Sequence, residues 1–326
     1  MRVAGSLDEL LAGATERRPL KPVDSKSGAA MERVLIGGTS YVVKHFTAPD
    51  WLADGSDDRT CRAVELYERG IYSAVADILD STVVAAARLE RPDGWPAALL
   101  MRDASDEFVA VDAPIDESTH AAILEAMAAL HARWWSAPPD TTYMPLARNY
   151  DMLSPRQATI EREALGDRSE VLRAVPSGWA RFADERADTY RTVAGLLDDP
   201  APLVEALLHG PQTFLHGDWK MGNLGRRADG RVVLVDWDRP AVGPPTVDLA
   251  WFIAVNCDRL RESKDDAIAR YHRALQAHGI ATGDWWADHT DLALLGAFLM
   301  LGWSKADQPD ELAWWSDVVR RAASLL

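Results

Sequence analysis

The sequence predicts an α+β fold of two lobes: a small β-rich N-terminal lobe and a larger, mostly helical C-terminal lobe. The first reason is length, because 326 residues exceed the usual range for a single hydrophobic core. The second is the distribution of patterns. Short β-branched runs and glycine turns lie before residue 103, whereas apolar residues at helical spacing dominate after it. We therefore assign residues 1–103 and 104–326 to the two lobes, with a helical insertion at about 146–210.

A β-hairpin that carries a lysine is predicted in the N-terminal lobe. Residues 31–36 (MERVLI) and 41–46 (YVVKHF) are predicted strands, joined by a turn at 37–40 (GGTS). Lys44 then lies within the second strand. Taken alone, this residue is more simply explained as an exposed lysine on an edge strand.

A helix and an apolar strand follow this hairpin. Residues 59–79 are predicted to form a helical stretch that carries Glu65 and Glu68. Residues 97–101 (AALLM) form a predicted strand that ends at Arg102–Asp103. This strand is a candidate for the one that leads into a hinge between the two lobes. An ordinary strand that leaves the sheet for a loop would have the same hydropathy, so hydropathy alone does not distinguish the two.

A second hairpin is predicted in the C-terminal lobe. Leu224–Arg227 and Val232–Val235 are short strands on either side of the turn residues 228–230 (ADG), and an Asp-Gly turn between strands is a strong hairpin indication. Because the two strands are antiparallel and nearly equal in length, their outer ends, at Asn223 and Asp236, return to the same edge of the hairpin. This convergence suits a shared metal ion.

The residues around this hairpin match the needs of phosphoryl transfer. That reaction requires a metal ion that neutralises phosphate oxygens, a group that orients the attacking hydroxyl, and cations on the phosphates. We expect Asp218 to accept the hydrogen bond of the acceptor hydroxyl and Lys220 to reach the γ-phosphate. Asn223 and Asp236 supply hard oxygen ligands for Mg²⁺, and Asp238 is an alternative to Asp236.

Each of these residues alone also has a structural explanation. Asp218 is consistent with a turn cap, Lys220 with a solvated surface lysine and Asp236 with the end of a strand. The complete set favours catalysis. We expect His216 to hold the loop by hydrogen bonding and Asp248 to brace it.

Two segments carry a family resemblance. HGDWKMGN (His216–Asn223) resembles the catalytic loop of aminoglycoside and choline kinase-like phosphotransferases, and LVDWDRPAVGPPTVDLAW (Leu234–Trp251) resembles the metal-binding and following segments of that family. The resemblance implies a two-lobed protein-kinase-like fold, ATP and Mg²⁺ as cofactors, and a small-molecule hydroxyl as acceptor.

The resemblance also assigns the upstream lysine and its partner. In this family a strand lysine contacts the α- and β-phosphates of the nucleotide and pairs with a glutamate on the next helix. Lys44 is the matching lysine. We expect Glu68 to be its partner because the apolar and aromatic residues after Glu68 fit the family pattern, with Glu65 as the alternative.

Two further segments are expected to contact the nucleotide. Ser27 and Gly28 lie in a small-residue loop before the first predicted hairpin, although an ordinary turn would have the same composition. The backbone of Met101, Arg102 and Asp103 resembles the family's adenine-binding hinge.

The sequence defines the acceptor pocket less well than the catalytic and metal-binding segments. Residues 118–135 form a predicted amphipathic helix, and the residues at 146–210 read as further helices. In related phosphotransferases, helices of this insertion wall the acceptor site. The pocket candidates are Trp251, Asn256 and Asp258.

Charge narrows the choice of partners. Residues 1–103 carry 13 Lys and Arg against 16 Asp and Glu, whereas the rest carry 22 against 34. This acidity excludes nucleic acid, which requires a basic face. It favours, narrowly, a cationic acceptor such as an aminoglycoside or amino sugar. Choline- or ethanolamine-like alcohols, simple sugars and other antibiotics stay open, and acidity that only maintains solubility is equally compatible.

The sequence also predicts the cellular location of the protein and leaves one competing functional class. The N-terminus lacks the apolar run of a signal peptide, and the chain has two cysteines without metal-site spacing, which favours the cytoplasm. The apolar stretch 292–303 is too short for a bilayer and is predicted to be a buried helix. A non-catalytic nucleotide-binding pseudokinase is the competing class, disfavoured because every expected catalytic residue has a candidate.

Overall fold

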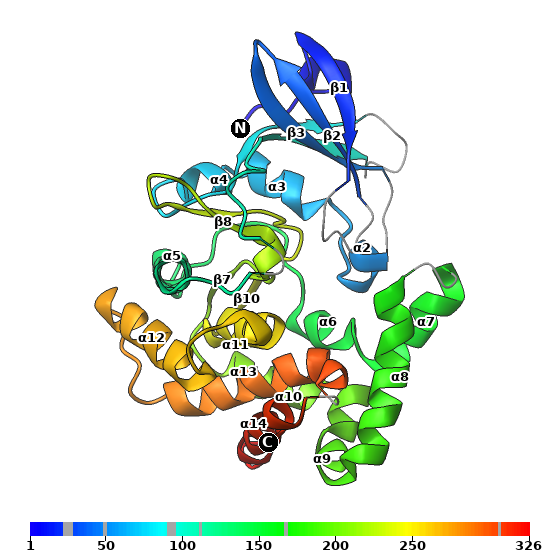
Figure 1. The fold of residues 1–326 in the computed structure, drawn as a ribbon, viewed down its shortest axis with the longest axis vertical. Helices are drawn as coiled ribbons and strands as arrows, with labels where there is room; N and C mark the ends of the chain where they lie inside the picture. Colours follow the sequence, from blue (N-terminus) through cyan, green and yellow to red (C-terminus); the bar gives the residue numbers. More distant parts are fainter. Residues whose placement is uncertain (22–28, 48–50, 90–95, 111–112, 166–168, 306–307) are drawn as a thin grey trace.

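The fold has a small antiparallel sheet at one end and a helical body at the other (Figure 1). The computed structural model describes residues 1–21, 29–47, 51–89, 96–110, 113–165, 169–305 and 308–326. The arrangement confirms the α+β class and the order of the two lobes predicted from the sequence.

The small lobe is built on a five-stranded antiparallel sheet. Its strand order is β1-β2-β3-β6-β5. The strands are β1 (Ala14–Leu20), β2 (Ala30–Ile36), β3 (Thr39–Phe46), β5 (Val83–Arg88) and β6 (Ala97–Arg102), accompanied by α1 (Leu7–Leu10), α2 (Trp51–Gly55), α3 (Arg62–Glu68) and α4 (Ile71–Ala74).

The hairpin formed by β2 and β3 confirms the first predicted hairpin. It turns at Gly37 and Gly38, whose φ angles of 57° and 81° are readily adopted only by glycine. Side chains alternate between the two faces of a strand, so Val42, Lys44 and Phe46 share one face of β3. Val42 and Phe46 belong to the large hydrophobic core that continues into the helical lobe. Lys44 is therefore directed toward the junction of the lobes.

The helical stretch predicted at 59–79 is wrong in its extent. The chain forms α3, turns at Gly70 with φ 75°, and then forms only the four residues of α4. A left-handed residue cannot continue an α-helix, so the glycine divides the segment. Leu79–Asp80 is a short strand, β4.

The second predicted hairpin is confirmed. β8 (Leu224–Arg226) and β9 (Val232–Leu234) pair antiparallel, and Gly230 in the turn has φ 89°. β4 pairs in parallel with β9 and completes a three-stranded sheet in the order β4-β9-β8. A strand from the first hundred residues thus joins the sheet of the second hairpin.

Helices make up most of the larger lobe. They are α5 (Glu117–Arg133), α6 (Leu146–Asp151), α7 (Pro155–Leu165), α8 (Glu170–Glu185), α9 (Ala187–Asp198), α10 (Ala201–Leu208), α11 (Thr246–Asn256), α12 (Lys264–Ala277), α13 (Trp286–Leu301) and α14 (Pro309–Ala323), with the 3₁₀ turns η1 (Met221–Asn223), η2 (Cys257–Arg259) and η3 (Gly302–Ser304). β7 (Thr213–Leu215) and β10 (Ala241–Gly243) form a separate two-stranded sheet.

Two buried helices, α11 and α13, pack against each other at the centre of this lobe. α13 confirms the buried helix predicted at 292–303. In the part of the chain that the structure describes, no helix has the length and apolarity needed to cross a bilayer.

Candidate active site

A short loop between β7 and η1 carries Asp218, and its carboxylate is held by two neutral donors. The indole Nε1 of Trp251 donates to Oδ1 at 2.9 Å, and the amide Nδ2 of Asn223 donates to Oδ2 at 2.9 Å. Nδ2 of Asn223 also donates to the main-chain oxygen of Asp218 at 3.0 Å. Asp218 is 7% exposed. These contacts fix the orientation of the carboxylate.

A fully buried carboxylate, Asp248 of α11, holds the backbone of this loop. It accepts hydrogen bonds from the backbone N–H groups of His216 and Gly217, both at 2.9 Å, and from the indole of Trp219 at 2.8 Å. Nε2 of His131, on α5, lies 3.1 Å from Oδ2 of Asp248. This is the bracing role expected of Asp248.

Two features of the loop explain its sequence. Gly217 has φ 83°, and a Cβ atom there would lie 2.2 Å from the backbone oxygen of Arg239, so only glycine fits. Burial lowers the pKa of His216. The neutral ring accepts a hydrogen bond at Nδ1 from the backbone N–H of Asp218 at 3.1 Å, in agreement with the loop-holding role expected of His216.

Lys44 meets two carboxylates that follow β9. Its Nζ lies 2.5 Å from Oδ1 of Asp236 and 2.5 Å from Oδ2 of Asp238. Asp236 has a φ of 68°, an uncommon conformation for a residue other than glycine. The strand of the small lobe and the hairpin of the larger lobe therefore join at an ionic cluster of three side chains.

The predicted pair between Lys44 and Glu68 is wrong in this structure. Glu68 forms a bidentate pair with Arg88 of β5, at 2.9 and 2.8 Å. The alternative, Glu65, accepts from the hydroxyl of Thr60 at 3.0 Å and from the backbone N–H of Thr142 at 3.1 Å. Both glutamates are satisfied elsewhere, which leaves Lys44 to the two aspartates.

The charges of the ionic cluster perturb one another. Burial alone would lower the pKa of Lys44, but the two carboxylates outweigh it and raise this pKa. Burial likewise opposes ionisation of Asp236, yet the Lys44 and Lys220 ammonium groups hold its pKa below the usual range. Burial raises the pKa of Asp238, and the neighbouring charge of Asp236 adds to the effect.

Oxygen atoms suited to a divalent cation lie at this cluster. Oδ1 of Asp238 is buried without a hydrogen-bond partner among the described residues. The outer ends of the hairpin converge as predicted, since the backbone N–H of Val235 donates to the oxygen of Asn223 at 3.0 Å. Carboxylate and amide oxygens are the ligands that Mg²⁺ prefers, so Asn223, Asp236 and Asp238 fit it chemically. Within the described ranges, no group of three or more His, Cys, Asp or Glu forms a ready-made metal site.

Lys220 lies beside the loop carboxylate. Its Nζ is 3.8 Å from Oδ2 of Asp218, and its side chain is 18% exposed. The ammonium group therefore stands at the mouth of the loop, next to the carboxylate expected to orient the acceptor.

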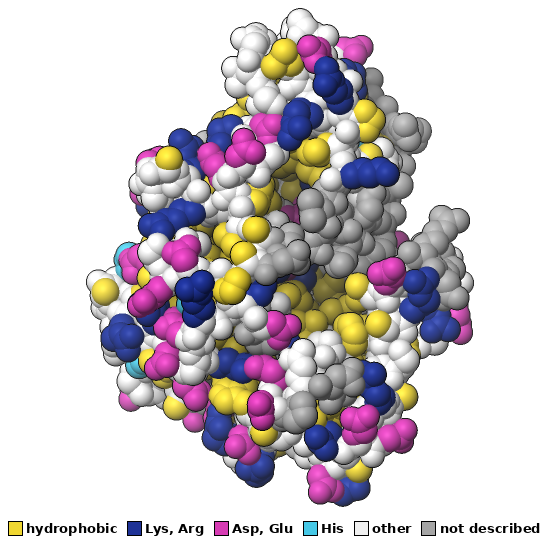
Figure 2. Space-filling view, viewed as in Figure 1, with side chains coloured by type: hydrophobic (Ala, Val, Ile, Leu, Met, Phe, Trp, Pro, Cys, Tyr) yellow, Lys and Arg dark blue, Asp and Glu magenta, His cyan; other side chains and the backbone are white. Residues whose placement is uncertain are grey.

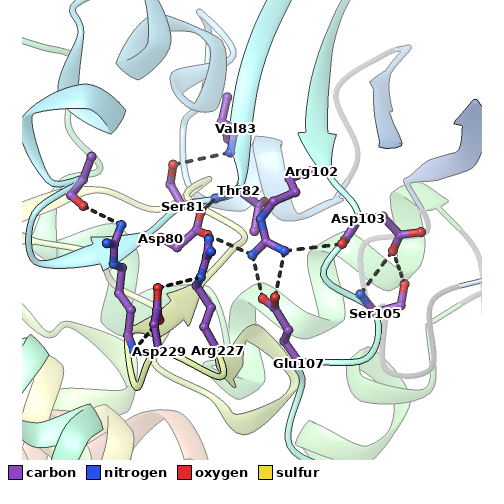
Figure 3. Close-up of polar contacts among 12 residues, drawn as sticks. Asp80, Ser81, Thr82, Val83, Arg102, Asp103, Ser105, Glu107, Arg227 and Asp229 are labelled. Atoms are coloured by element: carbon purple, nitrogen blue, oxygen red, sulfur yellow. Dashed lines mark hydrogen bonds and ion pairs between the residues drawn. The ribbon is translucent and has the colours of Figure 1, made fainter. Parts of the chain in front are cut away.

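The predicted hinge, at the end of β6, is linked to the hairpin of β8 and β9 by an ionic network (Figure 3). Arg102 donates to both carboxylate oxygens of Glu107, at 2.9 and 2.6 Å, and to Asp80 of β4 at 2.8 Å. Arg227, which follows β8, donates to the same oxygen of Asp80 at 2.7 Å. Asp80 thus links the hinge to the hairpin.

The backbone donors of the hinge are engaged within the protein. The N–H of Arg102 donates to the oxygen of Thr82 at 2.7 Å, and that of Asp103 donates to the oxygen of Ser40 at 3.4 Å. The carboxylate of Asp103 accepts from Arg33 and from the hydroxyl of Ser40, both at 2.7 Å. The expected adenine contact by this segment stays a prediction. Ser27 and Gly28 lie outside the described residues.

The three pocket candidates have different surroundings. Trp251 contacts the loop carboxylate directly, as described above. Asn256 was wrongly predicted: it is 2% exposed, accepts from the backbone N–H of Met221 and donates to the backbone oxygen of Trp219, both at 2.9 Å. Its amide braces the loop from behind. Asp258 is exposed on η2, and its role stays a prediction.

Sequence reasoning missed Arg239, which directly follows Asp238. The residue is 6% exposed, and its guanidinium lies 5.1 Å from the ring centroid of Trp251 and donates to Oδ1 of Asn149 on α6 at 2.6 Å. A charged residue next to a metal-binding motif was the available indication. The motif does not predict which residues contact Arg239, because Asn149 lies 90 residues away in the sequence.

Comparison with known proteins identifies the family. A model of the phosphotransferase enzyme family matches residues 20–286, which span both lobes and every described residue of the site. The chain belongs to this family. No curated protein matches the chain.

Solved structures agree with this phosphotransferase assignment at the level of the fold. A microcompartment-associated aminopropanol kinase is 12% identical, covers 94% of this chain and 90% of its own, and has a TM-score of 0.52. The choline kinase LicA from Streptococcus pneumoniae is 13% identical over 98% of this chain and 96% of its own, with a TM-score of 0.48. The order of the sheet and the helical lobe, together with the likeness to the aminopropanol kinase, gives this phosphotransferase the two-lobed kinase-like fold that the motifs implied.

Proposed function

We propose that this protein uses ATP and Mg²⁺ to phosphorylate a hydroxyl group of a small molecule. The observation that supports this function best is the fixed carboxylate of Asp218. Trp251 and Asn223 hold it on a loop that continues directly into the hairpin of Asp236. In the reaction that the family membership suggests, positioning and electrostatics supply most of the catalysis.

Asp218 orients the attacking hydroxyl. Both of its oxygens already accept one hydrogen bond from a neutral donor, which fixes the plane of the carboxylate while leaving lone pairs for a further donor. A hydroxyl that donates to this carboxylate is held in one direction. It gives up its proton to the carboxylate as its oxygen bonds to the γ-phosphorus of ATP, and the bond between that phosphorus and the bridging oxygen breaks to release ADP.

The phosphates of ATP are bound by two lysines, Lys44 and Lys220, and by a metal ion held at the hairpin. Lys44 anchors the α- and β-phosphates, and Lys220, beside Asp218, reaches the γ-phosphate. Asn223 and Asp236, together with the unpartnered oxygen of Asp238, would hold Mg²⁺. When bound, the ion neutralises phosphate oxygens.

The acceptor is the least constrained part of the proposal. An amino-sugar or aminoglycoside acceptor stays a prediction that rests on the acidity of the chain. On the face shown in Figure 2, acidic and basic side chains are interspersed over the helical lobe, and hydrophobic side chains line a hollow between the small lobe and the region of α7. The acidity is therefore not gathered into one patch on that face.

The proposal is tested by binding and by turnover. Addition of ATP with Mg²⁺ should raise the melting temperature, because a ligand that binds only the folded state stabilises it. Release of ADP should then depend on an acceptor from a panel of aminoglycosides, sugars, amino alcohols and hydroxy acids. Binding of ATP without turnover of any acceptor would favour a binding module.

A further inference from the structure

Arg239 is a buried cation without a counter-charge among the residues that the structure describes. No described carboxylate lies within ion-pair distance of its guanidinium, and its Nε is buried without a hydrogen-bond partner in the described structure. Its contacts are the neutral amide of Asn149 and the ring face of Trp251. The other two cations of the site differ, since Lys44 touches two carboxylates and Lys220 lies 3.8 Å from a third.

Such an arrangement is unfavourable for stability alone. A charge removed from water is costly unless a partner of opposite charge or a full set of hydrogen bonds replaces the lost hydration. A ring face and one amide oxygen compensate only part of that cost. The arrangement is therefore better explained by a ligand that carries the missing negative charge.

The position of Arg239 indicates which ligand this is. Trp251 contacts Arg239 with its ring face and Asp218 with its indole N–H. The guanidinium is thus separated by one side chain from the carboxylate that orients the hydroxyl. Asn149, on the other side, belongs to α6 of the helical segment expected to wall the acceptor site. Both contacts lie on the acceptor side of the site.

We propose that Arg239 recognises a negatively charged group, a carboxylate or a phosphate, on the hydroxyl compound that this protein phosphorylates. The inference rests on the proposed function and names its substrate class. The planar guanidinium suits both anions, because several N–H donors point to one side. A neutral acceptor would leave the charge uncompensated, and an amine would be repelled.

This inference opposes the cationic acceptor favoured by the overall charge. Surface charges act over distance and are screened by salt, with a Debye length of about 8 Å at physiological ionic strength. A buried charge next to the reacting group is screened far less. The local cation therefore outweighs the acidic surface in the choice of acceptor.

The test compares acceptors that differ in one group. The probes are glycerate, glycerol phosphate, glycerol and aminopropanediol, and likewise glucuronate, glucose and glucosamine, assayed by ADP release. Wild-type protein is compared with Arg239→Gln, which removes the charge, and Arg239→Lys, which retains it. Arg320→Gln is the matched control, because the side chain of Arg320 is 74% exposed on α14 and, among the described residues, pairs with Asp317 alone at the surface.

We expect the wild type to favour the anionic members over the amines in kcat/KM by about tenfold or more, the effect of one charged hydrogen bond. Arg239→Gln should abolish this preference, and Arg239→Lys and Arg320→Gln should keep it. The proposal is overturned if the wild type favours amines, or if Arg239→Gln lowers kcat/KM equally for every member.

Binding measurements separate this inference from the proposed function. Calorimetry is performed on protein saturated with ADP and Mg²⁺, with glucuronate and glucose as probes. If no probe is phosphorylated although ATP binds, the proposed function fails, but tighter binding of glucuronate that is lost in Arg239→Gln still supports anion recognition. Equal binding of glucuronate and glucose contradicts it. If Arg239→Gln does not fold, Arg239→Lys should retain the tighter binding of glucuronate, and equal binding of glucuronate and glucose by this variant contradicts the proposal.

Discussion

The two sides of the site balance their charges differently. In the proposed arrangement, Lys44 on the nucleotide side contacts Asp236 and Asp238 at 2.5 Å, so this cation is paired with carboxylates of the protein itself. On the acceptor side, Asp218 is held by neutral donors and Arg239 has no carboxylate partner among the described residues. Ion pairs within the protein therefore stabilise the nucleotide side. The acceptor side, in contrast, is arranged to bind charged or polar groups of a substrate.

The largest expected effect lies on the acceptor side, at the hydroxyl-orienting carboxylate. We expect Asp218→Asn to lower kcat by about 10³-fold, because the amide cannot take the hydroxyl proton. The affinity for ATP, measured by calorimetry, should stay within about twofold, since that residue does not contact the nucleotide in the proposed arrangement. Unchanged turnover would remove Asp218 from the mechanism.

Removing the nucleotide-side cation tests the internal balance. We expect Lys44→Met to destabilise the protein by about 3 kcal/mol, because two neighbouring carboxylates lose their shared partner. The affinity for ATP should fall as well. Chemical denaturation and calorimetry measure the two effects.

The same variant carries a pH dependence. Burial and the charge of Asp236 already hold the folded-state pKa of Asp238 above its usual value, and without the Lys44 ammonium group we expect this pKa to rise further and the pKa of Asp236 to rise with it. Carboxylates with raised folded pKa values favour the folded state when protonated, so Lys44→Met should lose stability, relative to wild type, as the pH rises from about 5 to about 8. A loss that is the same at both pH values would mean that the two carboxylates do not depend on Lys44.

A smaller effect is expected from the indole that holds the acceptor-side carboxylate. Trp251→Phe keeps a ring against Arg239 but removes the hydrogen bond to Asp218. We expect kcat to fall about tenfold, the effect of one lost hydrogen bond of about 1.4 kcal/mol, with ATP affinity unchanged. A change confined to the KM for ATP would place this indole on the nucleotide side instead.

The smallest effect is expected at the glutamate that the resemblance paired with the nucleotide-side lysine. Glu68→Gln breaks only the partly exposed pair with Arg88, so stability should fall by about 1 kcal/mol or less. The affinity for ATP should not change. A loss of affinity as large as that of Lys44→Met would show that Glu68 pairs with Lys44 when nucleotide is bound.

Sequence reasoning succeeded where the determinants are local. The hairpin of β8 and β9 follows from an Asp-Gly turn and two short apolar runs, and its geometry brings Asn223 and Asp236 together. The two-lobed architecture likewise follows from the distribution of strand and helix patterns.

It failed where partners come from distant segments. Glu68 was assigned to Lys44, but the pairing is decided by the position of Arg88 on a neighbouring strand, which no local pattern reports. Arg239 and Asn149 are separated by 90 residues, and Trp251 and Asp218 by 33. Side chains that meet across such separations are determined by tertiary packing.

The short strand β4 restricts how the chain can be divided. Leu79–Asp80 pairs with β9, almost half the chain further on, and Asp80 bonds to Arg227. A fragment that ends at residue 103 would carry an unpaired strand edge and an aspartate deprived of that arginine. During synthesis, β4 has no partner strand until residues 232–234 have been translated. The three-stranded sheet that contains β4 is completed only after the hairpin of β8 and β9 has been made.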